Sequence, residues 1–143
     1  MISPFVVRRA DWTRDFEHLR YIRETVFVHE QQVPLDMEWD ELDRACVHVV
    51  AFDNDGAPIG TGRLLPDGHI GRMAVLAAWR GKGVGGALLS ELMRIARERG
   101  FAEVILNAQV QAIAFYARHG FAAHGPQFLE AGIPHQAMRR QLT

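Results

Sequence analysis

The sequence predicts a mixed α/β fold, in which a mostly antiparallel β-sheet carries helices on its faces. Three observations lead to this fold class. The 143 residues are 48% apolar, which suffices for the core of one globular domain. Segments with apolar residues at helical spacing alternate with β-rich segments. Three of the β-rich segments follow one another with only turn residues between them, which is typical of antiparallel strands.

The first third of the chain is expected to contain one strand and one helix. Residues 4–9 read as a short strand, and apolar residues recur at helical spacing across residues 13–29. Asp11 or Thr13 could cap this helix, because both residue types are favoured at that position. Residues 31–44 combine a proline with several carboxylates and follow neither period, so we expect a loop with at most one short helical turn.

The middle of the chain is expected to form three consecutive antiparallel strands. They are predicted at residues 46–52, 58–65 and 69–76, where apolar and β-branched residues are frequent. Asp53-Asn54-Asp55-Gly56 separates the first two strands, and Pro66-Asp67-Gly68 separates the next two. Both linkers have the composition of tight turns, so the segments should pair as hairpins.

A second helix is predicted over residues 83–99, where apolar residues share one face and Gly100 follows the last turn. The helix joins two neighbouring strands, so these strands should run parallel. The remaining elements are a strand at 103–108, a helix at 111–119, and strands at 121–123 and 135–142. The expected sheet therefore has six to seven strands, in the order β-α-(α)-β-β-β-α-β-α-β-β.

Composition excludes several functional classes. The chain has 16 basic and 17 acidic residues, so no overall field would attract it to nucleic acid or to an anionic membrane. The N-terminus, MISPFVVRRADW, lacks the pattern of a signal peptide, and no apolar run reaches the length of about 18 residues that a spanning helix needs. We therefore expect a cytoplasmic protein without a membrane or nucleic-acid partner.

Cysteine and histidine usage indicates neither a disulfide nor a metal. Cys46 is the only cysteine, and its apolar surroundings favour a small buried hydrophobe over a nucleophile. The seven histidines are scattered without the spacing of metal ligands. No metal site is therefore expected.

A glycine-rich loop is the most informative motif. Gly81-Lys82-Gly83-Val84-Gly85-Gly86 matches the dinucleotide pattern G-x-G-x-x-G, but three antiparallel strands precede it, whereas that fingerprint belongs to the first unit of a parallel domain. A nucleoside-triphosphate loop is also excluded, because no G-K-[ST] follows at the required spacing.

Both excluded motifs share a physical principle that still applies to this loop. Glycines let consecutive N–H groups approach an anion at the start of a helix, and Arg80 and Lys82 add positive charge beside them. Gly85 and Gly86 each cost about 0.5–1 kcal/mol relative to alanine in the first helical turn, a cost without explanation unless something docks there. The loop therefore predicts an anion site, the alternative being a flexible turn.

The chain resembles the GNAT N-acetyltransferase superfamily over the whole of residues 1–143, as a single domain. Residues 80–85 match R-x-x-G-x-G/A, the acyl-CoA pyrophosphate signature of that family. Three further landmarks follow the family order: Met73-Ala74-Val75, Leu106-Asn107-Ala108-Gln109, and the F-Y-x-x-x-G-F pattern at residues 115–121. Within the superfamily, Glu30-Gln31 and the residues around it resemble the ElaA-like branch.

The resemblance implies that an acceptor amine attacks the thioester of acetyl-CoA directly in a ternary complex. In the family, a tyrosine at the position of Tyr116 protonates the departing thiolate; a core aromatic residue is the alternative role. Asn107 would contact the pantetheine arm or an ordered water, or would simply end its strand. The resemblance assigns the binding of acetyl-CoA to Met73, Ala74 and Val75 for the pantetheine arm, and to Arg80, Gly81, Lys82, Gly83, Val84, Gly85 and Gly86 for the pyrophosphate.

The general base is less clearly indicated. A carboxylate, a histidine or a water chain could accept the proton of the amine, and Glu30, Glu38, His69, Glu130 and His135 are all candidates. Glu130 and His135 are favoured as catalytic residues, because they fall between the last two strands, where acceptor sites of the family are often lined. A purely structural histidine remains the alternative for His135.

A carboxylate-rich run offers a second hypothesis about the acceptor. Glu38, Asp40, Glu41 and Asp43 could attract a cationic amine, or could be solvated or cap a helix. The spacing Glu38-x-Asp40-x-x-Asp43 also resembles an acidic pattern of the related acyl-homoserine-lactone synthases, but this chain is shorter and carries the R-x-x-G-x-G loop that those enzymes generally lack.

Two functions from different classes are therefore carried forward. The first is an acetyl-CoA-dependent N-acetyltransferase that acts on a small-molecule or peptide amine. The alternative is a non-catalytic module that binds or senses acyl-CoA, against which Tyr116 argues. The resemblance also allows a homodimer, since dimers are common in the superfamily.

Overall fold

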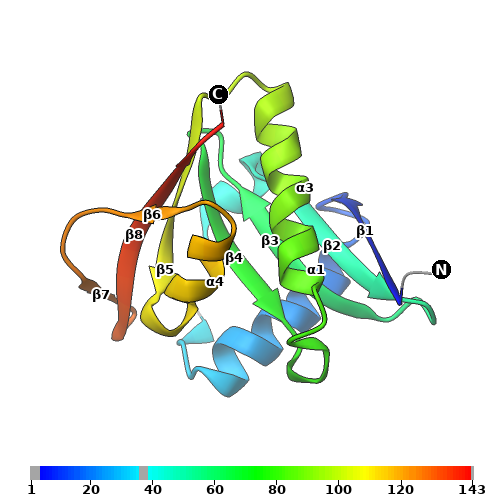
Figure 1. The fold of residues 1–143 in the computed structure, drawn as a ribbon. Coiled ribbons are helices and arrows are strands. Elements are labelled where there is room, and N and C mark those ends of the chain that lie inside the picture. Colours follow the sequence, from blue (N-terminus) through cyan, green and yellow to red (C-terminus); the bar gives the residue numbers. More distant parts are fainter. Residues whose placement is uncertain (1–3, 36–38, 143) are drawn as a thin grey trace.

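The computed structural model describes residues 4–35 and 39–142, and eight strands of this part form one mixed sheet (Figure 1). The sheet order is β1-β2-β3-β4-β5-β8-β6, and β7 also pairs with β8. Only β4 and β5 run parallel, which confirms the mostly antiparallel sheet and its one parallel pair. The strands are β1 (Phe5–Ala10), β2 (Val47–Asp53), β3 (Pro58–Leu64), β4 (His69–Val75), β5 (Glu103–Gln109), β6 (Ala122–Ala123), β7 (Phe128–Glu130) and β8 (Ile133–Gln141).

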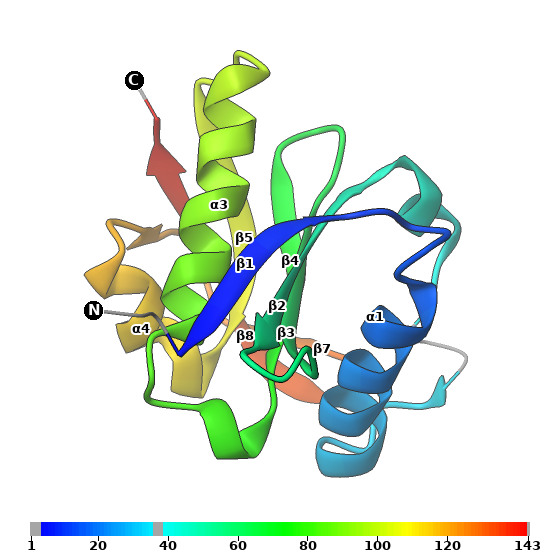
Figure 2. The same cartoon turned by 90° about the vertical axis from the view of Figure 1, so that its right-hand side faces the viewer.

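Helices cover both faces of the sheet (Figure 2). On one face lie α1 (Phe16–Arg23) and the π-helix that continues it, η1 (Glu24–Glu30). On the other face lie α3 (Val84–Glu98) and α4 (Ile113–Arg118). None of the helices in residues 4–35 and 39–142 is long and apolar enough to cross a lipid bilayer. Three short 3₁₀ segments complete the fold: η2 (Glu41–Ala45), η3 (Ala77–Trp79) and η4 (Val110–Ala112).

The apolar face of α3 packs on the sheet as its spacing predicts. Val84, Leu88, Leu92 and Ile95 are all buried in the larger of two core clusters. The helix ends at the expected glycine. The Phe101 N–H donates to the Ala96 carbonyl, and the Gly100 N–H donates to the Arg97 carbonyl. This pair of bonds closes the last turn. The smaller cluster fills the opposite face, between the sheet and α1 with η1.

The predicted helix over residues 13–29 is divided in the structure. α1 begins at Phe16, and from Glu24 the hydrogen bonding widens to the π pattern, so that the Gln31 N–H reaches back to the Val26 carbonyl at 3.1 Å. The predicted cap is wrong for α1 itself, because no side chain caps that helix. Asp11 instead accepts hydrogen bonds from backbone N–H groups in the turn before the helix.

The β2–β3 hairpin is confirmed, with a start one residue later than predicted. β2 begins at Val47, which leaves Cys46 partly exposed before the strand instead of buried within it. The Cys46 thiol donates to the Leu42 carbonyl. In the turn, Asp53 accepts hydrogen bonds from the N–H groups of Asp55 and Ala57, as aspartate does in tight turns.

The structure contains one strand that the sequence did not predict. β7 pairs with the start of β8 through only three residues, and the connecting turn consists of Ala131 and Gly132. Glycine and proline in residues 125–132 obscure so short a β signal, which is why eight strands form where six to seven were expected. β6 is also shorter than the predicted 121–123.

A buried ion-pair network joins α1, η2 and β3. Arg23 Nη1 lies 2.9 Å from Asp43 Oδ1, and Arg63 Nη1 lies 2.7 Å from the same oxygen. Arg23 and Asp43 are each 1% exposed. Arg63 also forms two hydrogen bonds of 2.9 Å with Asp40. Burial alone would raise the pKa of Asp43, but the two guanidinium groups hold that pKa below its usual value.

We expect Asp43→Asn to destabilise the protein by about 3–5 kcal/mol, because Arg23 and Arg63 would remain buried without their shared anionic partner. Chemical denaturation at pH 7 measures the free energy of unfolding. Asp55→Asn in the exposed β2–β3 turn is the control, and should change stability by less than about 0.5 kcal/mol. A similar small loss for both variants would contradict the role of the network.

The same network should make stability depend on acidic pH. The lowered pKa of Asp43 means that its contribution is complete above the unfolded pKa of about 4 and is lost as the pH falls through the folded pKa. The stability difference between the wild type and Asp43→Asn should therefore narrow below about pH 4. Denaturation curves across that range test the expectation.

Candidate active site

The two parallel strands separate beside the functional residues. β4 and β5 pair only at His69 with Ile105 and at Ile70 with Leu106. Beyond these pairs, β4 stays paired with β3, and β5 stays paired with β8. The edge of β4 from Gly71 to Val75 therefore has no neighbouring strand on the β5 side within the described residues. Met73, Ala74 and Val75 lie on this open edge, in the position expected for contact with a pantetheine arm.

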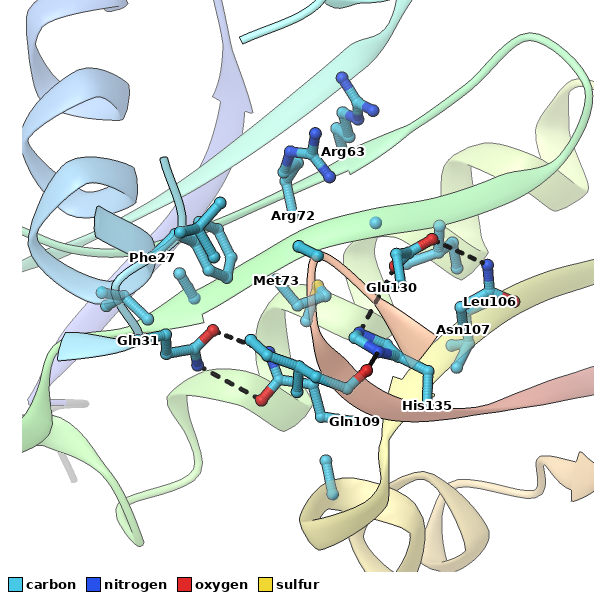
Figure 3. Close-up of a pocket in the computed structure, with 18 of the residues that line it drawn as sticks. Phe27, Gln31, Arg63, Arg72, Met73, Leu106, Asn107, Gln109, Glu130 and His135 are labelled. Atoms are coloured by element: carbon cyan, nitrogen blue, oxygen red, sulfur yellow. Dashed lines mark hydrogen bonds and ion pairs between the residues drawn. The ribbon is translucent and has the colours of Figure 1, made fainter. Parts of the chain in front are cut away.

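A pocket of about 750 Å³ occupies the space between the separated strands. Its walls come from η1, β3, β4, β5 and the β7–β8 hairpin (Figure 3). Of the residues predicted from the sequence, the pocket brings together Met73, Ala74, Val75, Arg80, Asn107, Tyr116, Glu130, His135 and His69.

Tyr116 reaches the pocket from the face that α3 and α4 cover. It is 9% exposed and packs between the rings of Phe115 and Phe121. Burial raises the pKa of Tyr116 to about 12, so the phenol keeps its proton at neutral pH. The hydroxyl forms no hydrogen bond with any residue in the described ranges. The hydroxyl oxygen is not fully enclosed by other protein atoms. The Tyr116 hydroxyl can therefore donate to a group that enters the pocket.

Glu130 and His135 meet where the β7–β8 hairpin lines the pocket. His135 is 6% exposed, and its Nδ1 lies 2.6 Å from the Ile133 carbonyl oxygen. This carbonyl can only accept, so Nδ1 carries a proton and Nε2 of the neutral ring is a proton acceptor. Nε2 lies 3.4 Å from Glu130 Oε2, and Asn107 Nδ2 lies 3.5 Å from Glu130 Oε1. The carboxylate can thus stabilise a proton on the ring.

The other candidate bases are placed differently. Both carboxylate oxygens of Glu30 accept from Arg80, at 3.0 and 2.8 Å, and Glu30 does not line the pocket. His69 does line it, with Nδ1 2.9 Å from Asp67 Oδ2. Glu38 lies outside the described residues.

The glycine loop lies beyond Arg80 and does not line the pocket itself. Gly83 is the N-cap of α3, with a φ of +88° that favours glycine, and no side chain caps the helix. The N–H groups of Val84, Gly85 and Gly86 belong to the first turn, where a helix supplies no acceptor. These donors and the helix dipole can hold an anion.

Packing against α4 explains Gly85 and Gly86, which corrects the inference that only a docked ligand accounts for them. A Cβ at Gly85 would lie 3.3 Å from Phe115, and a Cβ at Gly86 would lie 3.1 Å from His119. Glycine at these positions therefore leaves room for the side chains of α4 and its C-cap beside the first turn of α3.

The two cations of the loop each contact another group of the protein. Arg80 donates from Nε to the Val75 carbonyl at 2.9 Å and pairs with Glu30, which directs it along β4. Lys82 Nζ lies 5.2 Å from the ring centre of Trp79. The backbone N–H groups of the first helical turn are therefore the main anion donors in this arrangement.

Two members of the carboxylate-rich run, Asp40 and Asp43, already have cationic partners in the structure. Asp43 is buried, and both Asp40 and Asp43 are paired with arginine. The two aspartates also form a capping box at η2, so the alternative role of helix capping is correct for them. Glu41 is exposed.

Sequence reasoning did not assign five polar residues of the pocket to the site: Gln31, Arg63, Arg72, Gln109 and Gln111. Gln31 and Gln109 exchange amide hydrogen bonds of 3.3 and 2.8 Å and link η1 to the end of β5. Arg63 and Arg72 lie on the two central strands (Figure 3). Charged residues inside predicted core strands were the one signal that could have identified the two arginines.

Comparison with known proteins identifies the family. The model of the acetyltransferase (GNAT) domain matches residues 17–142. The uncharacterized N-acetyltransferase YjcF of Bacillus subtilis is 43% identical over 124 residues, which cover 84% of this chain and 88% of that protein.

Solved structures agree with the sequence matches. An acyl-CoA N-acyltransferase from Pseudomonas aeruginosa is 33% identical with a TM-score of 0.81, and the match covers 95% of this chain and 97% of that one. Escherichia coli ElaA is 26% identical with a TM-score of 0.79, covering 96% and 99%. Because the family model and these relatives each span most of the sequence, the chain belongs to the GNAT acetyltransferase family.

Proposed function

We propose that the protein is an acetyl-CoA-dependent N-acetyltransferase that transfers the acetyl group to the amine of a small molecule or peptide in a ternary complex. One observation carries this proposal: a proton donor, Tyr116, and a proton acceptor, the Glu130–His135 pair, line one pocket beside the open edge of β4. Direct transfer needs both functions at the same reacting carbon.

The donor would bind along the separated strands. The N–H groups in the first turn of α3 would hold the pyrophosphate, and main-chain groups of Met73 to Val75 would pair with the pantetheine amides as an added strand does. Contacts so far from the thioester fix its position, and such orientation lowers the entropic part of the barrier.

The chemistry would then pass through two proton transfers. His135 Nε2, assisted by Glu130, accepts the proton of the amine as its nitrogen attacks the thioester carbon. The C–N bond forms and the C–S bond breaks, so the products are the acetylated amine and CoA. Tyr116 donates a hydrogen bond or a proton to the departing sulfur, which suits a phenol that stays protonated at neutral pH.

Tyr116→Phe should lower kcat by about 10²-fold or more while leaving the dissociation constant of CoA nearly unchanged, because only the proton donor is removed. Release of free thiol from acetyl-CoA with pooled amines measures turnover, and calorimetric titration measures binding. Tyr21→Phe, at the exposed tyrosine of α1, is the matched control and should behave as wild type. Wild-type protein that binds acetyl-CoA but turns over no amine would favour the non-catalytic module.

His135→Gln should lower kcat by about 10²-fold, because the group that accepts the proton is missing. Glu130→Gln should lower kcat by a smaller factor. The exposed His124 provides the control, as His124→Gln leaves the pocket intact. Thiol release from acetyl-CoA measures kcat, and an unchanged kcat in His135→Gln would exclude His135 as the base.

Gly83→Val should weaken CoA binding by about tenfold or more, because the left-handed backbone at the start of α3 disfavours a branched side chain and the N–H donors would move. Gly56→Val is a matched control: Gly56 also has a positive φ and open space around it, but lies in the β2–β3 turn. Both variants should lose similar stability, and only Gly83→Val should lose affinity. Equal CoA affinity in a calorimetric titration of the two variants would contradict the site.

A further inference from the structure

The charges that line the pocket are unevenly distributed. Among the described lining residues, Glu130 is the sole carboxylate, whereas three are arginines: Arg63, Arg72 and Arg80. Arg63 and Arg72 come from β3 and β4, and Glu130 comes from β7, so the two signs of charge belong to different walls (Figure 3). The pocket is therefore polarised between a cationic wall and a wall that carries a carboxylate and a histidine.

The carboxylates that pair with Arg63 do not line the pocket. Asp40 and Asp43 pair with Arg63 at 2.9 and 2.7 Å, and neither is among the lining residues. Arg63 is 5% exposed, and its buried Nε forms no hydrogen bond with the residues that the structure describes. Burial would lower the pKa of Arg63, but Asp40 and Asp43 raise it, so this guanidinium stays charged.

Arg72 carries the accessible part of the cationic wall. Its side chain is 27% exposed, and its Nη2 lies 3.7 Å from Asp40 Oδ2, whose shorter bond is to Arg63. The residue has a φ of +51°, beside the register shift between β3 and β4. Such a conformation is uncommon for a side chain other than glycine, and the packing of the two strands has to maintain it. A guanidinium presents a planar set of donors that matches a carboxylate.

We propose that the acceptor carries a carboxylate as well as its amine, so that the substrate class is small amino acids. The carboxylate would face Arg72, and the amine would face Glu130 and His135. A zwitterion meets the opposite charge at each end, whereas an amine without a carboxylate has no group that Arg72 could bind. Val26, Phe27 and Val33 line the same pocket and offer apolar contact to the carbon skeleton.

This inference rests on the proposed function, and matched acceptors test it. Each amino acid is compared with the amine that lacks its carboxylate: phenylalanine with phenethylamine, β-alanine with ethylamine, and γ-aminobutyrate with propylamine. The rate of thiol release from acetyl-CoA gives kcat/KM for each acceptor. Each value is then divided by the fraction of that acceptor whose amine is unprotonated, so that acceptors of different basicity can be compared. For at least one pair, the kcat/KM of the amino acid should exceed that of its amine by about tenfold or more. This ratio corresponds to the contribution of a hydrogen bond between charged groups.

Arg72→Gln should remove this preference. The kcat/KM for the preferred amino acid should fall about 10- to 100-fold, and its ratio to the kcat/KM of the matched amine should fall to about one. Arg72→Lys, which keeps the charge without the planar donors, should retain part of the preference. Arg97→Gln, on the exposed side of α3, is the control and should behave as wild type. Thermal unfolding and CoA titration of each variant separate loss of recognition from loss of the fold.

A second readout does not require turnover. The carboxylate without an amine that corresponds to the preferred acceptor, such as phenylpropionate for phenylalanine, should compete with that acceptor in the wild type and lose this competition in Arg72→Gln. Amines that react as well as, or better than, their amino-acid partners would overturn this inference and leave the proposed function intact. So would an Arg72→Gln variant that loses activity equally toward both. Absence of turnover with every acceptor, while acetyl-CoA binds, would overturn the proposed function and this inference with it.

Discussion

β4 and β5 are hydrogen-bonded to each other at only two residue pairs, because each strand is held along the rest of its length by a different antiparallel neighbour. The gap that follows connects the two faces of the sheet. Tyr116 belongs to the core on the α3 side, whereas His135 lines the pocket together with Val26 and Phe27 of η1. A fully paired sheet would keep these groups apart, so the proposed donor and acceptor of the proton could meet only through this gap.

The buried ion pairs hold the walls of the gap in place. Arg23 ends α1, Asp43 belongs to η2 and Arg63 belongs to β3, so one carboxylate ties three elements together behind the pocket. The desolvation of such a cluster makes it a poor source of net stability, and its value lies in fixing one arrangement of those elements. The same arrangement turns the aspartates away from the pocket and leaves arginine on its surface.

Much of the fold could be predicted because local patterns agree with the final structure. The turn residues of the β2–β3 hairpin, the apolar face of α3 and the glycine after it each determine a local conformation that packing keeps. β7 could not be predicted, since three residues between glycines and prolines carry little β signal. No pattern in the sequence predicts the widening of the helix at Glu24 either.

The candidate site was predictable where residue type and local context suffice. Tyr116, Glu130 and His135 were expected from the resemblance to the GNAT family, and they line one pocket. The contacts of Asp40, Asp43 and Arg72 involve partners that are distant in the sequence, so charge counting alone left the environment of the carboxylates open. Gly85 and Gly86 were ambiguous for a related reason: a close helix and a bound anion require the same small residue.

The contact of α4 with the first turn of α3 has a mechanical consequence. Phe115 and His119 rest against Gly85 and Gly86, and Tyr116 lies between them on the same short helix. If the pyrophosphate binds at that turn, the anchor of the donor and the phenol that meets its sulfur are parts of one rigid unit. The distance between the first turn of α3 and the Tyr116 hydroxyl would then determine how long the pantetheine arm of the donor has to be. A donor with a shorter arm could reach the anchor or the phenol, but not both at once.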